Sequence, residues 1–345
     1  MRTAAILLLF VIVCCSCSPP KTDSFVVEPS FYHWKTVFSP SGMEQQVIRQ
    51  NKVQNIYLRF FDVAWDASYS KPAPIAQVRV NDSSFIRENG LHIIPTVFIT
   101  NECIHYIRPE QCHALAENIY QLITAIAAAN HIGPVTEIQV DCDWTASTKE
   151  KYFTILSALQ QIDTTHLYSA TIRLFQVKYR AEAGVPPVKK GLLMCYNMGN
   201  LKSAATENSI LDPEEVKKYT GNLDEYPLPL DVALPLFQWY VLFRNGGYTG
   251  LVQDLTDKEL QGIAKETGKN HFTLLQDTLL RNTQFKKGDM LRLEDCSYAS
   301  IMQTASVLRR KLNNHRLRLV LYHLDSITLK KYSAHEMEAV FHSLD

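Results

Sequence analysis

The feature that most constrains the fold of this 345-residue chain is an alternation of strand-like and helix-like segments. Eight runs have strand patterns, namely 31–38, 55–63, 92–100, 137–143, 167–175, 192–198, 231–240 and 317–324. Helical patterns separate most of them, namely 44–50, 84–88, 109–130, 147–162 and 212–219. Eight such units predict a closed (β/α)8 barrel of the α/β class. An open doubly wound sheet fits less well, because no glycine-rich phosphate turn follows any strand.

The segment between the seventh and eighth strands is too long for one crossover. Residues 244–316 hold two helical patterns, 256–265 and 298–313, and we expect them to form an insertion at the barrel mouth. Residues 29–345, which include this insertion, are predicted to form a single barrel domain. That size is normal for an α/β barrel with an insertion.

The amino-terminal segment has the pattern of an export signal. Arg2 precedes an apolar run over 4–13, which is too short to span a bilayer. The run ends in two cysteines, a serine and Cys17, which resembles a bacterial lipobox. We expect a lipoprotein signal peptide over 1–17, lipidation at Cys17, a tether over 18–28 and a place in the bacterial cell envelope, periplasmic or outer-membrane, through this membrane anchor. A plain signal peptide with incidental cysteines is the alternative.

Composition excludes several classes of function. The formal net charge is zero and the basic residues are scattered, so nucleic-acid binding is not indicated. Three of the eight cysteines lie in the first 17 residues, and the odd number that remains excludes a complete disulfide framework. No zinc-type spacing is present, and we expect neither a metal nor a cofactor. The oligomeric state stays open.

The fourth strand is half apolar and half acidic. With the two-residue period of a strand, Gln139, Asp141 and Asp143 share one face and apolar residues occupy the other. Buried carboxylates are costly unless they are paired, so the strand marks either a functional cluster or a polar barrel interior. By the same parity Arg173 on the fifth strand faces the barrel. We expect it to reach both aspartates, to lower their pKa values and to keep them ionised.

In (β/α)8 barrels the site lies at the carboxyl ends of the strands. The strand ends predicted here are rich in carboxylates, amides and aromatic rings, which suit sugars because hydroxyls need polar partners and the C–H faces of sugars stack on rings. We therefore expect a glycan or oligosaccharide ligand. The candidate site residues beside Asp141 and Asp143 are Asp62, Glu102, Trp144, Arg173, Tyr196, Asn197, Trp239 and Asp325.

Two short motifs resemble the signatures of glycoside hydrolase family 18, the chitinase and endo-N-acetylglucosaminidase barrels. Asp141-Cys-Asp-Trp resembles the fourth-strand motif Asp-x-x-Asp-x-Asp-x-Glu, and Met194-Cys-Tyr-Asn197 resembles the sixth-strand motif Met-x-Tyr-Asp. Leu234-Pro-Leu-Phe237 also resembles the seventh strand of that family, so the resemblance covers about 137–240. The chain also resembles lipoprotein barrels of Bacteroides-like bacteria, and that resemblance implies no activity for this chain.

The resemblance implies a mechanism in which the acetamido group of the substrate attacks the anomeric carbon. Asp143 would orient the acetamido nitrogen, Asp141 would hold Asp143, and Tyr196 would bond the acetamido oxygen. Asn197 stands where the family has an aspartate, and the general acid of the family falls at Thr145. Threonine cannot supply a proton at neutral pH, and loss of a general acid costs about 10²- to 10⁴-fold in rate.

Two hypotheses from different classes follow. In the first, which we favour because many carboxylates converge on the rim, the protein is a glycosidase whose acid comes from Glu102, Asp62 or Asp325 facing Asp143. In the second, it is a non-catalytic glycan-binding lipoprotein that keeps only the sugar-holding part of the site. A purely structural network of arginine and aspartate in the barrel interior is the remaining alternative.

Overall fold

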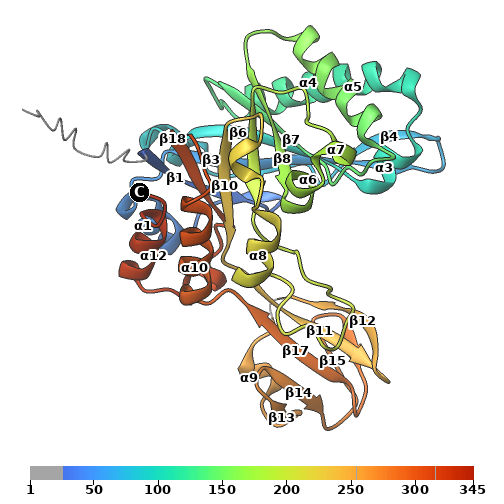
Figure 1. Ribbon diagram of the computed structural model, residues 1–345, viewed down its shortest axis with the longest axis vertical. Helices are drawn as coiled ribbons and strands as arrows, with labels where there is room; N and C mark the ends of the chain where they lie inside the picture. The colour runs from blue at the N-terminus through green and yellow to red at the C-terminus, as the bar shows by residue number, and fades with distance from the viewer. Residues whose placement is uncertain (1–25, 254, 315) are drawn as a thin grey trace, which may run out of the picture.

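The computed structural model describes residues 26–253, 255–314 and 316–345, and these form a barrel with a separate β-sheet lobe (Figure 1). The predicted signal peptide and Cys17 lie outside the described residues. Among the described helices, none combines the length and apolar character that a membrane crossing requires.

Eight parallel strands form the described barrel and confirm the (β/α)8 prediction. They follow one another around the barrel in the order β1, β18, β10, β9, β8, β7, β6 and β3, and β3 pairs with β1 to close it. The strands are β1 (Val26–His33), β3 (Asn55–Asp66), β6 (His92–Ile99), β7 (Glu137–Asp141), β8 (Leu167–Arg173), β9 (Lys190–Met194), β10 (Leu230–Pro235) and β18 (Arg316–Tyr322).

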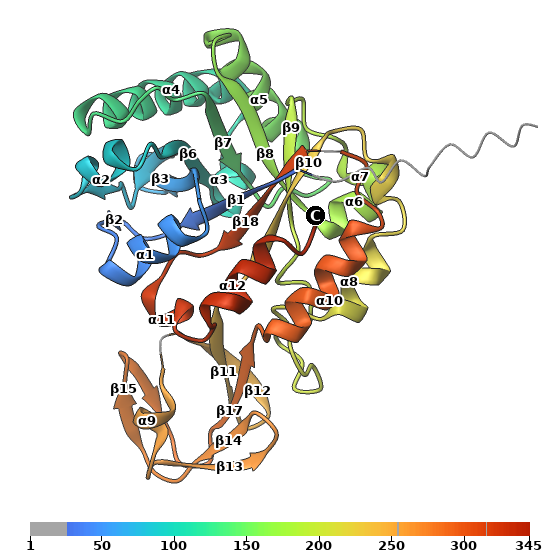
Figure 2. The same cartoon turned by 90° about the vertical axis from the view of Figure 1, so that its left-hand side faces the viewer.

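Helices cover the outside of the barrel (Figure 2). They are α1 (Gly42–Gln50), α2 (Ser83–Glu88), α3 (Asn101–Tyr106), α4 (Cys112–Ala129), α5 (Lys149–Ile162), α6 (Leu174–Lys178), α7 (Arg180–Ala183), α8 (Pro213–Tyr219), α10 (Tyr298–Arg309), α11 (Ser326–Leu329) and α12 (Ala334–Phe341), with 3-10 turns η1 (Pro109–Gln111) and η2 (Leu223–Glu225). In α4, Leu115, Ile119, Ile123 and Ile126 are buried at helical spacing, which gives the apolar stripe that packs on the barrel.

Three strand boundaries differ from the prediction in ways that affect the site. The first strand begins at Val26, so residues 26–28 of the predicted tether belong to the barrel. The fourth strand, β7, ends at Asp141, two residues earlier than predicted. The seventh strand ends at Pro235, and the chain then leaves the barrel at Gln238.

The insertion is a β-sheet lobe, drawn in orange at the lower end of the molecule in Figures 1 and 2. Its elements are β11 (Gln238–Arg244), β12 (Gly247–Val252), α9 (Asp257–Leu260), β13 (Ala264–Gly268), β14 (His271–Leu274), β15 (Thr278–Leu280), β16 (Thr283–Phe285) and β17 (Met290–Asp295). Five of the strands form one sheet, in the order β12, β11, β17, β14, β13. The lobe has an apolar core of its own, which includes Leu242, Leu274 and Leu291.

The predicted insertion, 244–316, was therefore wrong at its end and in its helical content. The described lobe ends at Asp295, and α10 is a barrel helix that buries Ile301, Ala305 and Leu308. The predicted helix over 256–265 stops at Leu260, because Gly262 takes a positive φ of 80° and the chain continues into β13.

Two small strand pairings complete the described fold. Strand β4 (Lys71–Ile75) extends the barrel sheet as an antiparallel hairpin with the end of β3, and β2 (Val37–Phe38) pairs with β5 (Arg79–Val80).

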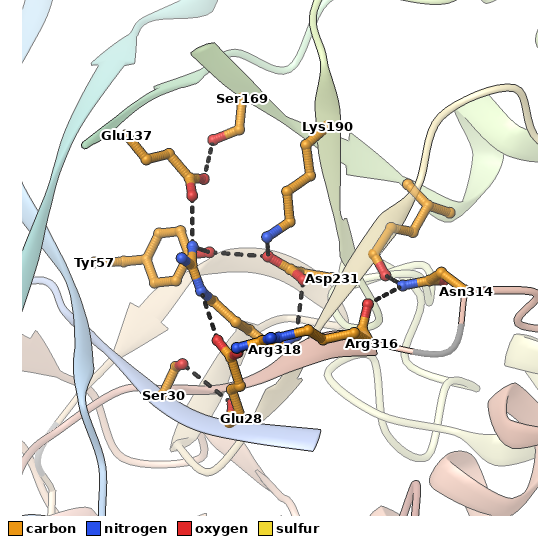
Figure 3. Close-up of polar contacts among 11 residues, drawn as sticks. Glu28, Ser30, Tyr57, Glu137, Ser169, Lys190, Asp231, Asn314, Arg316 and Arg318 are labelled. Atoms are coloured by element: carbon orange, nitrogen blue, oxygen red, sulfur yellow. Dashed lines mark hydrogen bonds and ion pairs between the residues drawn. The ribbon is translucent and has the colours of Figure 1, made fainter. Parts of the chain in front are cut away.

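A polar network closes the bottom of the barrel, at the amino ends of the strands (Figure 3). The guanidinium of Arg318 donates to Glu137 Oε2 at 2.5 Å and to Tyr57 Oη at 3.1 Å. Tyr57 donates to Asp231 at 3.1 Å, and Lys190 pairs with the same carboxylate at 2.5 Å. Each of these buried charges thus meets an opposite charge, as burial requires. The network is a structural floor beneath the site.

Breaking this floor should destabilise the fold. We expect Glu137→Gln to lower the free energy of unfolding by about 3 kcal/mol, because Arg318 then loses its closest buried counter-ion. Urea denaturation at neutral pH measures the change. The matched control is Glu214→Gln in α8, where the ion pair with Lys217 is exposed and its loss should fall within experimental error. Equal effects of the two substitutions would contradict the structural role of the floor.

Candidate functional site

A cavity of about 560 Å³ opens at the carboxyl ends of the barrel strands. Its aromatic lining residues are Tyr32, Trp34, Phe98, Tyr196, Phe237, Trp239 and Tyr322. Its charged lining residues are Lys35, Arg59, Asp62, Asp141, Asp143, Arg173, Asp325 and Lys331. The volume and the mixture of rings with a few polar groups are typical of a site for a small ligand.

The wall formed by β7 and β8 is held by three matched side-chain pairs. The pairs are Ser169 with Glu137 at 2.6 Å, Thr171 with Asp141 at 2.6 Å, and Arg173 with Asp143 at 2.5 Å. The members of each strand are spaced so that they share the inner face of the barrel, as the two-residue period predicts. A buried acid on one strand thus receives its hydrogen bond from the next strand.

The guanidinium of Arg173 binds both carboxylate oxygens of Asp143. Its Nε donates to Oδ1 at 2.5 Å and its Nη2 donates to Oδ2 at 3.1 Å. The side chains are 19% and 32% exposed, so the pair lies in the cavity wall but is reachable from the cavity. Burial opposes the charge of the guanidinium, yet Asp143 holds the pKa of Arg173 above its ordinary value.

Asp141 lies deeper and titrates differently from the prediction. The residue is only 5% exposed, and burial followed by the charge of Asp143 raises the pKa of Asp141 to about 6. Arg173 and the hydrogen bond from Thr171 lower it only in part. Arg173 does lower this pKa, but burial and the charge of Asp143 raise it more, so the expectation that the pKa of Asp141 lies below its ordinary value was wrong.

Two further ion pairs line the cavity. Arg59 donates Nε to Asp62 Oδ1 at 2.7 Å and pairs its Nη2 with the other oxygen of that carboxylate. Lys35 pairs with Asp325, whose Oδ1 also accepts the backbone N–H of Ile327 at 2.8 Å. Burial opposes ionisation of Asp325, but the hydrogen bond from Lys35 leaves the pKa of this carboxyl below its ordinary value. Asp325 is therefore not an available proton donor, and both oxygens of Asp62 are engaged by Arg59.

Eight of the ten predicted site residues line the cavity, and two do not. Trp144 was predicted to bind substrate, but it is fully buried behind the wall, stacks on Tyr152 at 5.1 Å and donates to the carbonyl of Ala183 at 2.9 Å. The two-residue alternation places Trp144 on the face opposite Asp141 and Asp143, and the structure buries it on that outer side, so the prediction that it binds substrate was wrong. Glu102 was predicted to be a catalytic acid, but it is exposed in the first turn of α3 and is not part of the cavity lining.

Thr145, at the position of the family's general acid, also lies outside the cavity lining. The residue is exposed, and its hydroxyl is 2.9 Å from the hydroxyl of Ser147. Its backbone N–H donates to the Thr148 hydroxyl at 2.9 Å. These local bonds direct the segment toward the start of α5 rather than into the barrel.

Several lining residues escaped prediction. Arg59 faces inward together with the predicted Asp62, although strict alternation separates them, because the pairing of β3 with β6 shifts register between Arg59 and Phe61. Gln253 and Thr256 come from the insertion, which was expected at the barrel mouth but without these residues as part of the site. Tyr322 could have been predicted, since it has the same parity as Arg318 on the eighth strand and therefore shares the inner face of the barrel.

The described residues offer little to a metal ion. No group of three or more histidine, cysteine, aspartate or glutamate side chains within the described ranges is arranged to hold one. The carboxylates of the cavity are instead engaged by arginine and lysine. The five cysteines of the described chain are all buried and unpaired as disulfides.

No protein-family model matches the sequence, and no curated protein matches it. Solved structures share the fold. The spore cortex-lytic enzyme SleL of Bacillus cereus superposes with a TM-score of 0.54 at 12% identity, over 93% of this chain and 75% of that chain. A chitinase from Bacteroides thetaiotaomicron gives 0.53 at 12% identity, over 92% and 97%. A chitinase-like agglutinin from Robinia pseudoacacia gives 0.53 at 12% identity, over 92% and 99%. The chain thus has the barrel fold of these proteins.

The buried carboxyl of Asp141 should make stability depend on pH. Its pKa rises from 3.8 to about 6 on folding, so its contribution to stability is fully present below 3.8 and is lost as the pH rises through about 6. We expect Asp141→Asn, which keeps an oxygen for Thr171, to escape this loss. Relative to the wild type it should gain on the order of 2 kcal/mol between pH 4 and pH 7. Urea denaturation at both pH values measures the gain, and an identical difference at both would contradict it.

Proposed function

We propose that the protein binds a glycan in the barrel cavity without hydrolysing it. The observation that carries the proposal is the bidentate bond of Arg173 to Asp143, beside a Thr145 that faces solvent. Together they leave the described site with sugar-binding groups but with no acid placed to protonate a leaving oxygen. The aromatic lining and the paired carboxylates and guanidiniums support a sugar as the ligand.

The roles that the resemblance implies for the two aspartates are not reproduced. Asp141 would have to hold Asp143, yet its Oδ1 accepts from Thr171 while Asp143 is held by Arg173. An acetamido nitrogen that seeks Asp143 would compete with a charge-assisted hydrogen bond, which is the stronger kind. Tyr196 keeps its role most plainly, because its buried hydroxyl has no hydrogen-bond partner among the described residues and the residue lines the cavity.

A hydrolase that uses Asp141 as its acid is the second candidate. The raised pKa of Asp141 favours it, since roughly a tenth of the carboxyl is protonated at pH 7 when its pKa is about 6. Such an enzyme needs protonated Asp141, so its rate would fall as the pH rises above about 6. Deep burial of this carboxyl beneath the cavity favours the binding function instead.

Binding without release is the expected result. The full-length protein in detergent should retain oligosaccharides from a mixed panel, and the panel should show no new reducing ends after prolonged incubation. Asp143→Asn should weaken binding at least tenfold, or about 1.4 kcal/mol, because a paired acceptor in the cavity wall is lost. Glu102→Gln, an exposed carboxylate outside the cavity, is the matched control and should bind like the wild type.

Reducing ends released by the wild type would contradict the binding function. Their loss in Asp141→Asn, with a rate that falls above about pH 6, would assign the reaction to the second candidate.

We further propose that Cys17 anchors the protein in a bacterial envelope membrane. The short apolar segment that ends at this cysteine supports the anchor. In a bacterial host the wild type should take up labelled fatty acid and sediment with membranes, and Cys17→Ala should do neither. The control is Cys296→Ala, a buried cysteine of the barrel. Label on the Cys17→Ala protein would contradict lipidation at this residue.

A further inference from the structure

We infer that the cavity selects neutral glycans whose sugars present pairs of adjacent hydroxyl groups, with Arg59 and Arg173 as the residues that determine this specificity. The inference rests on the proposed function and names the class of ligand for the same site. It goes against the resemblance, which implies recognition of an acetamido group.

The cavity contains the same arrangement of side chains twice. In each, an arginine donates Nε and Nη2 to the two oxygens of an aspartate, and the guanidinium lies near an aromatic ring. Arg59 binds Asp62 and lies 5.5 Å from the ring centre of Trp34. Arg173 binds Asp143 and lies 6.0 Å from the ring centre of Tyr196. All of these residues line the cavity.

Both pairs belong to the lining of one cavity. Arg59 and Asp62 lie on β3, Arg173 ends β8, and Asp143 follows the end of β7. Only β6 separates β3 from β7 in the barrel. A ligand that fills the cavity meets both pairs.

A paired arginine and aspartate suit a diol. A guanidinium has five N–H donors, and two of its nitrogens serve the carboxylate here. Nη1 of Arg173 has no acceptor among the described residues, whereas Nη1 of Arg59 donates to the carbonyl of Trp34 at 3.4 Å and keeps one further N–H. Each carboxylate oxygen keeps a further lone pair, so donors and acceptors lie side by side in each pair. Two adjacent hydroxyls can engage more of these donors and acceptors at once than a single hydroxyl can.

Charge and hydrogen bonding disfavour the other classes of sugar. An acidic sugar would find Arg59, Arg173 and Lys35 already neutralised by carboxylates in the same wall. It would also meet those carboxylates as like charges. An acetamido N–H could donate to a remaining lone pair of Asp143, but the carbonyl of a trans amide points the opposite way and cannot accept from Arg173 at the same time. A neutral diol can do both, so it fits the pair as it stands.

A glycan array with the full-length protein in detergent tests the inference. The panel holds neutral hexose oligosaccharides such as glucans and mannans, N-acetylglucosamine oligomers, and uronate or sulfated oligomers. We expect retention of neutral members, with affinity at least tenfold higher than for the other two classes. Lysine keeps the charge of arginine but cannot bind a carboxylate through a planar fork, so Arg173→Lys and Arg59→Lys should each lose at least tenfold toward the neutral class.

The control is Arg108→Lys, at a pair with Glu110 whose arginine side chain is 64% exposed, and it should bind like the wild type. Thermal unfolding of each variant verifies that it is folded. Preference for acetylated or anionic members, or unchanged neutral binding in both cavity variants, would overturn the inference while leaving glycan binding intact. Retention of no glycan at all, or cleavage of the retained ones, would overturn the proposed function itself.

Discussion

The site depends on the requirement that a carboxylate inside the barrel must be matched by a neighbouring donor. The inward positions of β7 place Glu137 and Asp141 in the interior, and Asp143 follows at the mouth. Burial of these groups would be prohibitive without partners. The neighbouring strand β8 supplies Ser169, Thr171 and Arg173 at the same two-residue spacing. The geometry of parallel strands thus arranges the polar wall that defines the cavity.

Buried carboxylates are paired at both ends of the barrel, but the pairs at the amino ends of the strands differ from those at the carboxyl ends. The difference distinguishes pairs that stabilise the fold from pairs that could contact a ligand. At the floor, Arg318, Glu137 and Asp231 satisfy one another in a buried network. At the mouth, the pairs formed by Arg59 and Arg173 are partly exposed to the cavity and keep unused hydrogen-bonding capacity. Polar groups whose hydrogen bonds are all made within the protein stabilise the fold, whereas polar groups with unused donors or acceptors can bind a ligand. Asp143 is therefore charge-paired with Arg173 while the pair keeps the hydrogen-bonding capacity that the proposed glycan binding requires.

Periodicity predicted most of the barrel because burial imposes it directly. The eight strands and the inward face of Gln139, Asp141 and Arg173 follow from alternation, and the structure places them accordingly. Prediction failed where alternation was not followed or is interrupted. Trp144 was assigned to the site because it follows the strand end, although alternation places it on the outer face, where the structure buries it. Arg59 was missed because a register shift after it returns Asp62 to the same face, and such a shift leaves no reliable mark in one sequence.

Contacts between elements that are far apart in the sequence could not be predicted either. The insertion was predicted to hold two helices, over 256–265 and 298–313. The first stops at Leu260, and the second packs on the barrel after the sheet of the lobe. The pKa of Asp141 could not be judged from the nearness of Arg173 in the strand order alone. Burial, and after it the charge of Asp143, raises this pKa more than Arg173 lowers it, and only the three-dimensional structure shows how deeply Asp141 is buried.

A crystal structure of the protein with a bound oligosaccharide tests the central claim most directly. The account predicts an intact glycan in the cavity, with Arg173 still bonded to both oxygens of Asp143 and sugar hydroxyls on the outer edge of that pair. A glycan cleaved at the cavity, or an Asp143 that has left Arg173 to contact the reacting sugar, would contradict it.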